Sequence, residues 1–453
     1  MKRTTFLKTT AALAAGSVFG ASLSCNTNSK TPAKNIRTNW AGNYQYKAPE
    51  VYTPGNVDEV RRLVKKLNRQ KALGSAHCFN DIADSPQSQI STEKLNKVVA
   101  INKDLGTITV EGGARYGQFA PGLSEAGFAL HNLASLPHIS VAGACATGTH
   151  GSGVSNGNLS TEVRAIELVT PDGELVTLDR EKDGDRFKGA IVGLGALGIV
   201  TRLTLDLVPA FEVRQDIFEE LPLESLKEHF NEIMSAGYSV SLFTDWRHKK
   251  VSQVWVKRKA DGGIGNMDNT FFDARAAVKN MHPISSLSAE NCTEQMGVAG
   301  PWYERLPHFK MGFTPSSGEE LQSEFFVAQE NAVDAILAVE KKGEEIFPHL
   351  LISEIRTIAG DDLWMSPCYK RDSVAIHFTW KQHTEEVLNL VSMLENELAP
   401  YQPRMHWGKL FTLKPDQLQN RYERYDDFLK LAREFDPAGK LRNAYLDRTF
   451  YNT

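Results

Sequence analysis

Apolar residues recur at helical spacing soon after the N-terminal region. Val57, Val60, Val64 and Leu67 lie three or four residues apart, with charged residues between them. This pattern predicts an amphipathic helix that packs one face against a core. Patterns of the same kind predict helices over 221–237, 329–343 and 422–435.

Alternating apolar and polar residues indicate the strands. Residues 163–179 form two alternating runs joined by Pro-Asp-Gly, which is typical of a hairpin turn. Residues 199–208 alternate in the same way and end at Pro209. Residues 97–111 predict two strands around a turn, and a Gly-Gly pair separates them from a helix. Further strands are expected over 239–246, 253–259 and 323–329.

The mixture of elements changes near residue 211. Before it the chain has many strands and few long helices, and after it helical and strand-like stretches alternate. With 453 residues the chain is long enough for two domains. The sequence therefore predicts an α+β fold with one domain over 39–210 and a second α+β domain from 211 onward.

Composition excludes several classes of function. The chain is 41% hydrophobic and 23% charged, and its formal net charge is -4. Without a basic excess we expect no nucleic-acid partner. The 12 histidines include no zinc-type spacing and no H-E-x-x-H, so no metal site is expected.

Residues 1–25 resemble an export signal, with a basic start, an apolar run and small residues at the end. "KRTTFLK" resembles a twin-arginine motif with Thr4 in place of the second arginine. "SLSC", which ends at Cys25, resembles a lipoprotein processing site. In that case Cys25 is lipidated and residues 26–38 form a polar tether; the alternative is cleavage nearby and release into the periplasm. An exported bacterial protein is expected either way.

Four cysteines remain beyond this signal, and they contain no C-x-x-C. An oxidising compartment permits disulfides, but four cysteines allow three pairings and their spacing does not choose among them. They are Cys78, Cys145, Cys292 and Cys368.

Two glycine motifs resemble nucleotide fingerprints but lack the required context. "GLGALG" at 193–198 precedes a strand-like run, whereas a Rossmann fingerprint precedes a helix. "GACATGTH" at 143–150 lacks the lysine of a P-loop. The small-residue loops at 74–80 and 143–153 can nevertheless bring backbone N–H groups close to a pyrophosphate.

The chain resembles flavoproteins of the vanillyl-alcohol-oxidase type. The segments "GSAHCFNDIADS", "ASLPHISVAGACATGTHGSG" and "KGAIVGLGALGIVTRLTLDLVP" carry that resemblance, and "SEIRTIAGDDLWMSP", "AIHFTW", "HWGK" and "FDPAGKLRNAY" narrow it to the alditol oxidase (xylitol oxidase) subgroup, which is related to the aldonolactone oxidases. The resemblance runs from Asn39 to the C-terminus. It implies a monomer with FAD between two α+β subdomains (39–210), a cap domain (211–400), and a C-terminal segment (401–453) that returns to the FAD domain.

The resemblance assigns the first loop a covalent role. His77 matches the histidine that is bonded to the flavin 8α-methyl group, and a neutral imidazole is a suitable nucleophile for that carbon. The other positions that match contacts to FAD are Gly74, Ser75, Ala76, Cys78, Phe79, Asn80, Ser135, Ser140, Gly143, Thr147, Gly148, Thr149, His150, Ile199 and His406.

Cys145 has two interpretations. It resembles the position of a second flavin bond in bicovalent relatives, although the subgroup does not require a cysteine there. Alternatively it is a small buried thiol that packs a tight loop.

Substrate residues are expected on two strands. Residues i and i+2 of a strand share a face, so Glu354 lies beside Arg356, and His377 beside Thr379. Taken alone, such pairs also suit a cross-strand ion pair or a surface ladder. By resemblance, Lys409, Glu354 and Arg356 are catalytic, and the same residues bind a polyol together with Ser135 and Thr379.

The implied reaction is oxidation of the terminal CH2OH group of an alditol such as xylitol or sorbitol. Lys409, coupled to Glu354, would help to take the hydroxyl proton while hydride passes to flavin N5, and dioxygen would become hydrogen peroxide. Ala134 suits either an oxidase or a dehydrogenase, so a quinone or cytochrome is another possible acceptor. An aldonolactone oxidase or dehydrogenase is the alternative activity, and a non-catalytic flavin- or sugar-binding lipoprotein is the alternative of another class.

Overall fold

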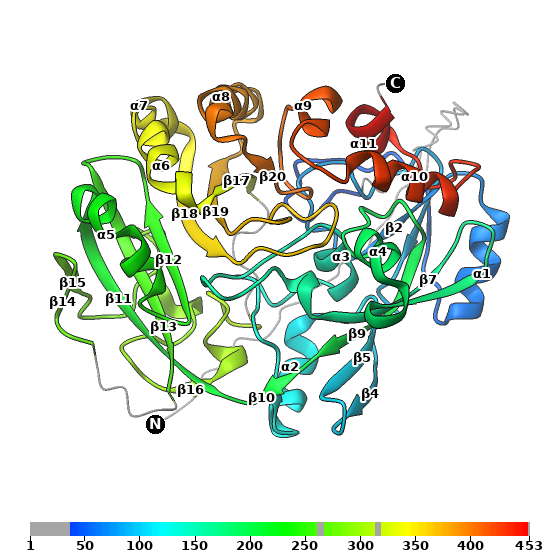
Figure 1. Cartoon of the computed structure of the whole chain (residues 1–453), viewed down its shortest axis with the longest axis horizontal. Coiled ribbons are helices and arrows are strands. Elements are labelled where there is room, and N and C mark those ends of the chain that lie inside the picture. Colours follow the sequence, from blue (N-terminus) through cyan, green and yellow to red (C-terminus); the bar gives the residue numbers. More distant parts are fainter. Residues whose placement is uncertain (1–36, 261–266, 313–318, 452–453) are drawn as a thin grey trace, which may run out of the picture. The chain divides into compact units, whose positions relative to one another are not determined.

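The computed structural model describes residues 37–260, 267–312 and 319–451 (Figure 1). The first sheet along the chain has three parallel strands. The export signal and most of the tether, residues 1–36, lie outside the described residues. The packed chain already includes Arg37, because its Nη1 donates to Gln89 Oε1 at 2.7 Å. The strands are β1 (Glu50–Tyr52), β3 (Ser88–Ser91) and β2 (Gln70–Leu73), in that order.

The predicted amphipathic helix is α1 (Val57–Lys66), between β1 and β2. The Asn56 side chain caps it by accepting a hydrogen bond from the Glu59 N–H. Val60 and Val64 are fully buried, as the stripe predicted. They pack in a small core of their own, separate from the main hydrophobic core.

A five-stranded antiparallel sheet follows, and it confirms the predicted hairpin and the strand after the glycine motif. The strand after the glycine motif is β9, and its side chains are alternately buried and half-buried along its whole length. In sheet order the strands are β4 (Val98–Asn102), β5 (Thr107–Glu111), β9 (Ile199–Asp206), β7 (Val163–Val169) and β8 (Leu175–Asp179). The associated elements are α2 (Tyr116–Glu125), α3 (Val141–Ala146), α4 (Arg180–Ile191) and the pair β6 (Phe128–Ala129) and β10 (Val208–Pro209).

The second domain is built on a ten-stranded sheet. Its core path is β11 (Glu212–Pro222), β13 (Lys250–Lys259), β12 (Ser239–Thr244), β18 (Leu350–Ile358), β19 (Ser373–Lys381) and β17 (Glu320–Ala328). The short strands β14 (Thr270–Phe271), β15 (Ala274–Ala276) and β16 (Gly300–Pro301) extend it beyond β11. Helices α5 (Leu223–Ser235), α6 (Ala332–Glu340) and α8 (Thr384–Glu397) pack on it, and α7 (Gly343–Ile346) precedes β18.

The C-terminal segment belongs to both domains, which corrects the expected boundary at residue 400. Its first strand, β20 (Arg404–Met405), pairs with β17 at the end of the ten-stranded sheet. Only then does the chain return: α10 (Tyr425–Phe435) contacts α4, and Lys440 Nζ donates to the Val64 carbonyl at 2.9 Å (Figure 1). The remaining helices are α9 (Pro415–Gln419) and α11 (Ala444–Leu446).

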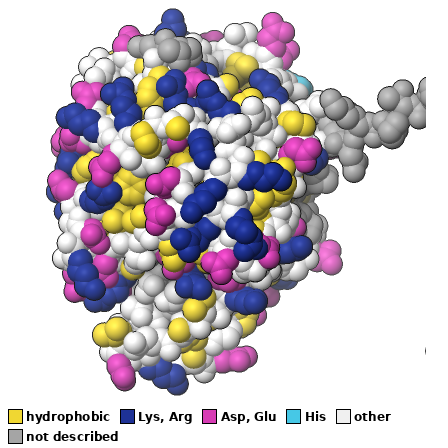
Figure 2. All heavy atoms as spheres, turned by 90° about the vertical axis from the view of Figure 1, so that its right-hand side faces the viewer, with side chains coloured by type: hydrophobic (Ala, Val, Ile, Leu, Met, Phe, Trp, Pro, Cys, Tyr) yellow, Lys and Arg dark blue, Asp and Glu magenta, His cyan; other side chains and the backbone are white. Residues whose placement is uncertain are grey.

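The surface agrees with the modest net charge. Figure 2 shows acidic and basic side chains interspersed over one face. Ion pairs of this mixed kind include Arg164 with Glu181 at 2.8 Å and Arg180 with Asp206 at 2.8 Å. In the described ranges no helix is long and apolar enough to cross a membrane.

Candidate active site

One cavity of about 710 Å³ joins the two domains. The small-residue loops of the first domain line part of it, and the strands β17, β18 and β19 line another part. Residues of other segments, such as Phe243, His308 and Lys409, complete the lining. The predicted cofactor-binding and substrate-binding residues thus meet at one place. Those that line the cavity are Gly74 to Phe79, Ser135, Gly143, Thr147, Thr149, His150, Glu354, Arg356, Thr379, His406 and Lys409.

The first loop is held in an unusual conformation next to His77. Ala76 adopts φ 57°, in the left-handed region that side chains other than glycine rarely occupy. The Trp40 backbone N–H donates to the Ala76 carbonyl at 2.8 Å and holds this turn. The indole of Trp40 also stacks on the His77 ring, with 4.6 Å between centroids and 16° between planes.

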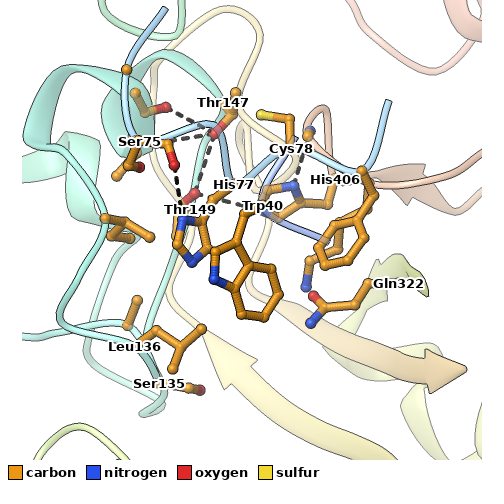
Figure 3. A pocket seen from close by; sticks show the side chains of 18 of the residues that line it. Trp40, Ser75, His77, Cys78, Ser135, Leu136, Thr147, Thr149, Gln322 and His406 are labelled. Atoms are coloured by element: carbon orange, nitrogen blue, oxygen red, sulfur yellow. Dashed lines mark hydrogen bonds between the residues drawn. The ribbon is translucent and has the colours of Figure 1, made fainter. Parts of the chain in front are cut away.

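His77 presents a neutral, unpaired nitrogen to the cavity. Its Nδ1 lies 3.3 Å from the Ser75 carbonyl, and its buried Nε2 has no hydrogen-bond partner in the structure. Burial lowers the pKa of His77 to about 4, although the Ser75 carbonyl opposes this. Figure 3 shows Trp40 beside His77, between the Ser135–Leu136 segment and Gln322. His77 therefore places a neutral imidazole, which can act as a nucleophile, in the wall of the cavity.

The two loops approach each other as closely as glycine allows. A Cβ on Gly74 would meet Ser140 Oγ at 2.5 Å, and one on Gly143 would meet the same atom at 2.8 Å. Ser140 Oγ itself is buried without a partner. Small residues with unpaired polar atoms suit a large cofactor with phosphates and hydroxyls. The residues present therefore fit FAD.

Four predicted cofactor residues do not line the cavity. Ile199 packs in the small core with Val60 and Val64, and Gly198 and Val200 line the cavity instead, because successive residues of a strand face opposite ways. Asn80 Nδ2 donates to the Trp407 and Lys409 carbonyls at 2.8 Å, so it holds that segment in place. Ser140 lies behind Gly74 and Gly143, and Gly148 turns against Pro367 with φ +67°.

Three strands present one polar row to the cavity. Their register places Glu324 of β17 opposite His377 of β19, and His377 opposite Glu354 of β18. The residues between them point the other way: Phe325, Ile376 and Ile355 belong to the main hydrophobic core. Strand alternation thus puts the polar side chains on one face, as predicted for Glu354 and Arg356.

Glu324 is the centre of this row, and sequence reasoning missed it. Its Oε2 accepts from Lys409 Nζ at 2.7 Å, and its Oε1 lies 3.2 Å from His150 Nε2 and 3.4 Å from Arg356 Nη2. The direct ion pair of Lys409 is thus with Glu324, and the expected partner Glu354 attracts Lys409 more weakly. Burial alone would raise the pKa of Glu324, but Lys409 and His150 hold it well below the usual value.

Glu354 is held from the other side of the row. Its Oε1 accepts from His308 Nε2 at 2.7 Å and lies 3.4 Å from Arg356 Nε. Arg356 and His308 keep the pKa of Glu354 low against the effect of burial. Arg356 Nη1 also donates to Ser135 Oγ at 3.2 Å, which links the cap strands to the FAD domain.

The polar row and its partners balance their charges, and burial lowers the pKa of the row's histidine. Two carboxylates, Glu324 and Glu354, face one guanidinium and one ammonium. Burial lowers the pKa of Lys409, against the attraction of Glu324. Burial and then Lys409 lower the pKa of His377 to about 3, and its ring bridges Thr379 Oγ1 at 3.3 Å and Lys409 Nζ at 3.5 Å. Such a site suits a neutral ligand with many hydroxyl groups.

The four cysteines of the described chain are all free thiols. Cys145 is buried, and its Sγ lies 3.7 Å from Tyr116 Oη and 3.9 Å from the Leu159 carbonyl. Burial raises the pKa of Cys145 to about 12, so its thiolate is disfavoured. These contacts agree with the packing interpretation. Among the described residues no group of three or more His, Cys, Asp or Glu side chains could hold a metal ion.

Comparisons with known proteins agree with this geometry. The family model described as FAD binding domain matches residues 48–179. The model described as D-arabinono-1,4-lactone oxidase matches residues 321–449, which include β17, β18 and β19. The first match covers the small-residue loops and the second covers the polar row.

An alditol oxidase from Streptomyces sp. is 49% identical to this chain over 413 residues, which cover 90% of this chain and 97% of the relative. The chain belongs to the alditol oxidase family. It is therefore an FAD-dependent oxidoreductase that acts on CH–OH groups. More distant relatives are the L-gulonolactone oxidase of Mus musculus, 25% identical over 91% of this chain and 98% of its own length, and the L-gulono-1,4-lactone dehydrogenase of Mycobacterium tuberculosis, 28% identical over the same shares.

A solved structure of another oxidase has the same fold as this chain. The crystal structure of cholesterol oxidase from Brevibacterium sterolicum has a TM-score of 0.73 and covers 92% of this chain and 96% of its own, at 14% identity. The predicted α+β fold with an FAD-binding domain of the vanillyl-alcohol-oxidase type is confirmed. The enzyme class also displaces the alternative of a non-catalytic binding lipoprotein.

Proposed function

We propose that this protein oxidises the terminal CH2OH group of an alditol to the aldehyde, with dioxygen reduced to hydrogen peroxide. The observation that carries the proposal is the buried polar row, Glu324, His377 and Glu354, beside the loops that fit FAD. When bound, FAD supplies a two-electron acceptor that dioxygen can reoxidise.

An alditol matches the polar row in charge and in hydrogen bonding. It is neutral, and it carries a hydroxyl that both donates and accepts on every carbon. Glu354 can accept from such a hydroxyl, Thr379 can donate or accept, and Arg356 can only donate, while Lys409 donates as an ammonium and can accept as a neutral amine. Leaving one of these buried groups unpaired costs about 1–3 kcal/mol, so apolar alcohols would bind poorly.

Lys409 is the group that we propose to accept the hydroxyl proton of the substrate. Burial lowers its pKa, which makes the neutral amine accessible, while its hydrogen bond to Glu324 fixes the position of Nζ. Removal of that proton leaves the electron pair on oxygen to form the aldehyde as the hydride leaves carbon. Arg356 and Ser135, joined at 3.2 Å, would hold the neighbouring hydroxyls.

We propose that FAD is bonded covalently to His77. Its buried Nε2 is unpaired and its imidazole is neutral at physiological pH, as a nucleophile requires. Cys145 is directed to Tyr116 and Leu159, so we propose one covalent bond and not two.

The exported location is also a proposal, and it rests on residues 1–25 alone. A covalent cofactor cannot be lost outside the cytoplasm, which is consistent with export. With a lipid at Cys25, the protein would be a monomer anchored to the membrane. The polar tether after Cys25 would let its domains extend into the periplasm.

A panel of substrates and acceptors tests the function. The purified holoprotein would be supplied with xylitol, sorbitol, an aldonolactone and a simple alkyl alcohol, each with dioxygen and separately with an artificial acceptor. We expect peroxide release with the alditols at least about 100-fold faster, as kcat/KM, than with the alkyl alcohol. Preference for the lactone would favour the aldonolactone alternative, and turnover only with the artificial acceptor would make the protein a dehydrogenase.

A further inference from the structure

A second layer of residues lies behind Glu354. Lys257 of β13 is fully buried, and its Nζ donates to the Leu306 carbonyl at 2.5 Å, the Pro307 carbonyl at 3.2 Å and His308 Nδ1 at 3.1 Å. An ammonium has three hydrogens, and three acceptors surround this one. The charged groups that face it are Glu354 and Arg356, and burial lowers its pKa to about 7 against the attraction of Glu354.

This arrangement determines the tautomer of His308. Because Nδ1 accepts from Lys257, the neutral ring carries its proton on Nε2. That proton is donated to Glu354 Oε1 at 2.7 Å. The ring is fixed by edge contacts with Phe243 and Trp255, whose centroids lie 5.5 Å and 5.2 Å away. Burial and then Lys257 lower the pKa of His308 to about 4, so it stays neutral.

The segment that carries His308 is tied to the substrate side of the cavity. The His308 backbone N–H donates to the Ser135 carbonyl at 3.1 Å. Thr293 Oγ1 donates to the Pro307 carbonyl at 2.8 Å and anchors the segment from behind. One short segment thus positions both Glu354 and Ser135.

Glu354 is left with one oxygen for a ligand. His308 donates to Oε1 and Arg356 Nε lies 3.4 Å from the same atom, whereas no residue in the described ranges donates a hydrogen bond to Oε2. Glu354 lines the cavity, so a ligand can approach this oxygen. A carboxylate oxygen without a donor accepts strongly from a hydroxyl group.

We propose that Lys257 and His308 are positioning residues that act through Glu354: the ammonium fixes the His308 tautomer, and His308 occupies one carboxylate oxygen so that the other accepts a substrate hydroxyl. The identity of that substrate as an alditol rests on the proposed function. The hydrogen bonds from Lys257 to His308 and from His308 to Glu354 form a relay. This relay is a property of the protein alone, so it can be tested without turnover.

The first test reads the tautomer directly. Nitrogen NMR of holoprotein labelled at histidine would assign the His308 signals from their loss in His308→Gln. We expect Nε2 protonated and Nδ1 unprotonated in the wild type, and a changed ratio in Lys257→Met. Thr293→Val, which removes a hydrogen bond to the same segment, is the matched control and should leave the tautomer unchanged. A proton on Nδ1 in the wild type, or identical spectra in Lys257→Met, would overturn the relay.

The second test separates positioning from folding. Gln at 308 keeps an N–H donor near the place of Nε2, whereas Leu does not, so the conservative variant should rescue binding. We expect KM for the alditol to rise about 10-fold or more in His308→Leu and less than about 3-fold in His308→Gln, with flavin content unchanged in both. Equal KM in the two variants would overturn the proposal. Absence of alditol turnover in the wild type would instead refute the proposed function, and the NMR result would still decide the relay.

Discussion

Glu324 is the side chain of the polar row that pairs with both Lys409 and Arg356. It contacts Lys409 at 2.7 Å and Arg356 at 3.4 Å, and it is buried to 1% exposure. The sequence offers a weak signal for it, since it stands alone before the apolar run "FFV" in a strand. Resemblance highlighted the substrate residues around it, but its role depends on partners far away in the chain.

Replacing Glu324 with Gln should destabilise the protein and impair catalysis together. The amide cannot neutralise Lys409 and Arg356, and breaking a buried ion pair by removing one partner costs about 3–5 kcal/mol. We expect a clearly lower Tm by calorimetry and slower oxidation of alditols. Glu224→Gln on α5, where Glu224 forms an exposed pair with Lys227, is the control and should leave both unchanged. A wild-type Tm in Glu324→Gln would show that Glu324 does not carry this charge network.

Replacing His77 with Ala should convert the bound FAD to a dissociable cofactor. The substitution removes the imidazole, with its Nε2 and its stacking on Trp40, but leaves the loops around Gly74 and Gly143 in which FAD would lie. We expect the yellow colour of the wild type to remain with acid-precipitated protein and that of His77→Ala to stay in the supernatant. Cys145→Ala should behave as the wild type does, and flavin release from it would indicate that Cys145 forms the bond.

At the scale of elements, the register of three strands builds the substrate side. Strand alternation could be predicted from "SEIRT" and "IHFTW", and it placed Glu354 beside Arg356 correctly. The pairing of β19 with both β17 and β18 could not, because register depends on contacts between residues far apart in the chain, such as Glu324 with His377 and Glu354 with His377. The pairing of β20 with β17 in turn brings Lys409 beside Glu324.

Long periodic elements were predictable and short ones were not. The helix at 57–66 and the hairpin at 163–179 have clear patterns, and both are confirmed. The parallel sheet of β1, β3 and β2 was missed because its strands have three or four residues, too few to show alternation.

The buried histidines should make the folded state sensitive to acid. The pKa values of His308 and His377, about 4 and about 3, lie below the value of about 6.5 in an unfolded chain, so only the unfolded state takes up these protons as the pH falls from 7 to 5. Each histidine then costs about 2 kcal/mol. Burial raises the pKa of Asp361 to about 6, which offsets about 1 kcal/mol.

Thermal unfolding at about pH 7 and about pH 5 measures this dependence. We expect a lower Tm at the acidic pH, and a smaller drop in His308→Gln, which lacks one of the titrating groups. An equal or higher Tm of the wild type at the acidic pH would contradict neutral, buried imidazoles in the cavity.

At the scale of the whole molecule, the domains from residue 37 onward follow an N-terminal region that we propose to be an export signal. If Cys25 is lipidated, the full-length protein expressed in a bacterium should partition into the detergent phase on extraction. Cys25→Ala should abolish that partition without changing activity, because the residues assigned to catalysis all come after Arg37 in the chain. Detergent partition that persists in Cys25→Ala would refute lipidation at this residue.

Lys409 lines the cavity between the two domains, and it is the group proposed to take the hydroxyl proton of the substrate. The most direct measurement is anaerobic stopped-flow reduction of the flavin by an alditol, in the wild type and in Lys409→Met. We predict that the variant keeps its FAD and remains folded, with a lower Tm because Glu324 loses an ion-pair partner, and that it is reduced at least about 100-fold more slowly. Reduction of Lys409→Met at a rate close to that of the wild type would contradict the assignment of this site.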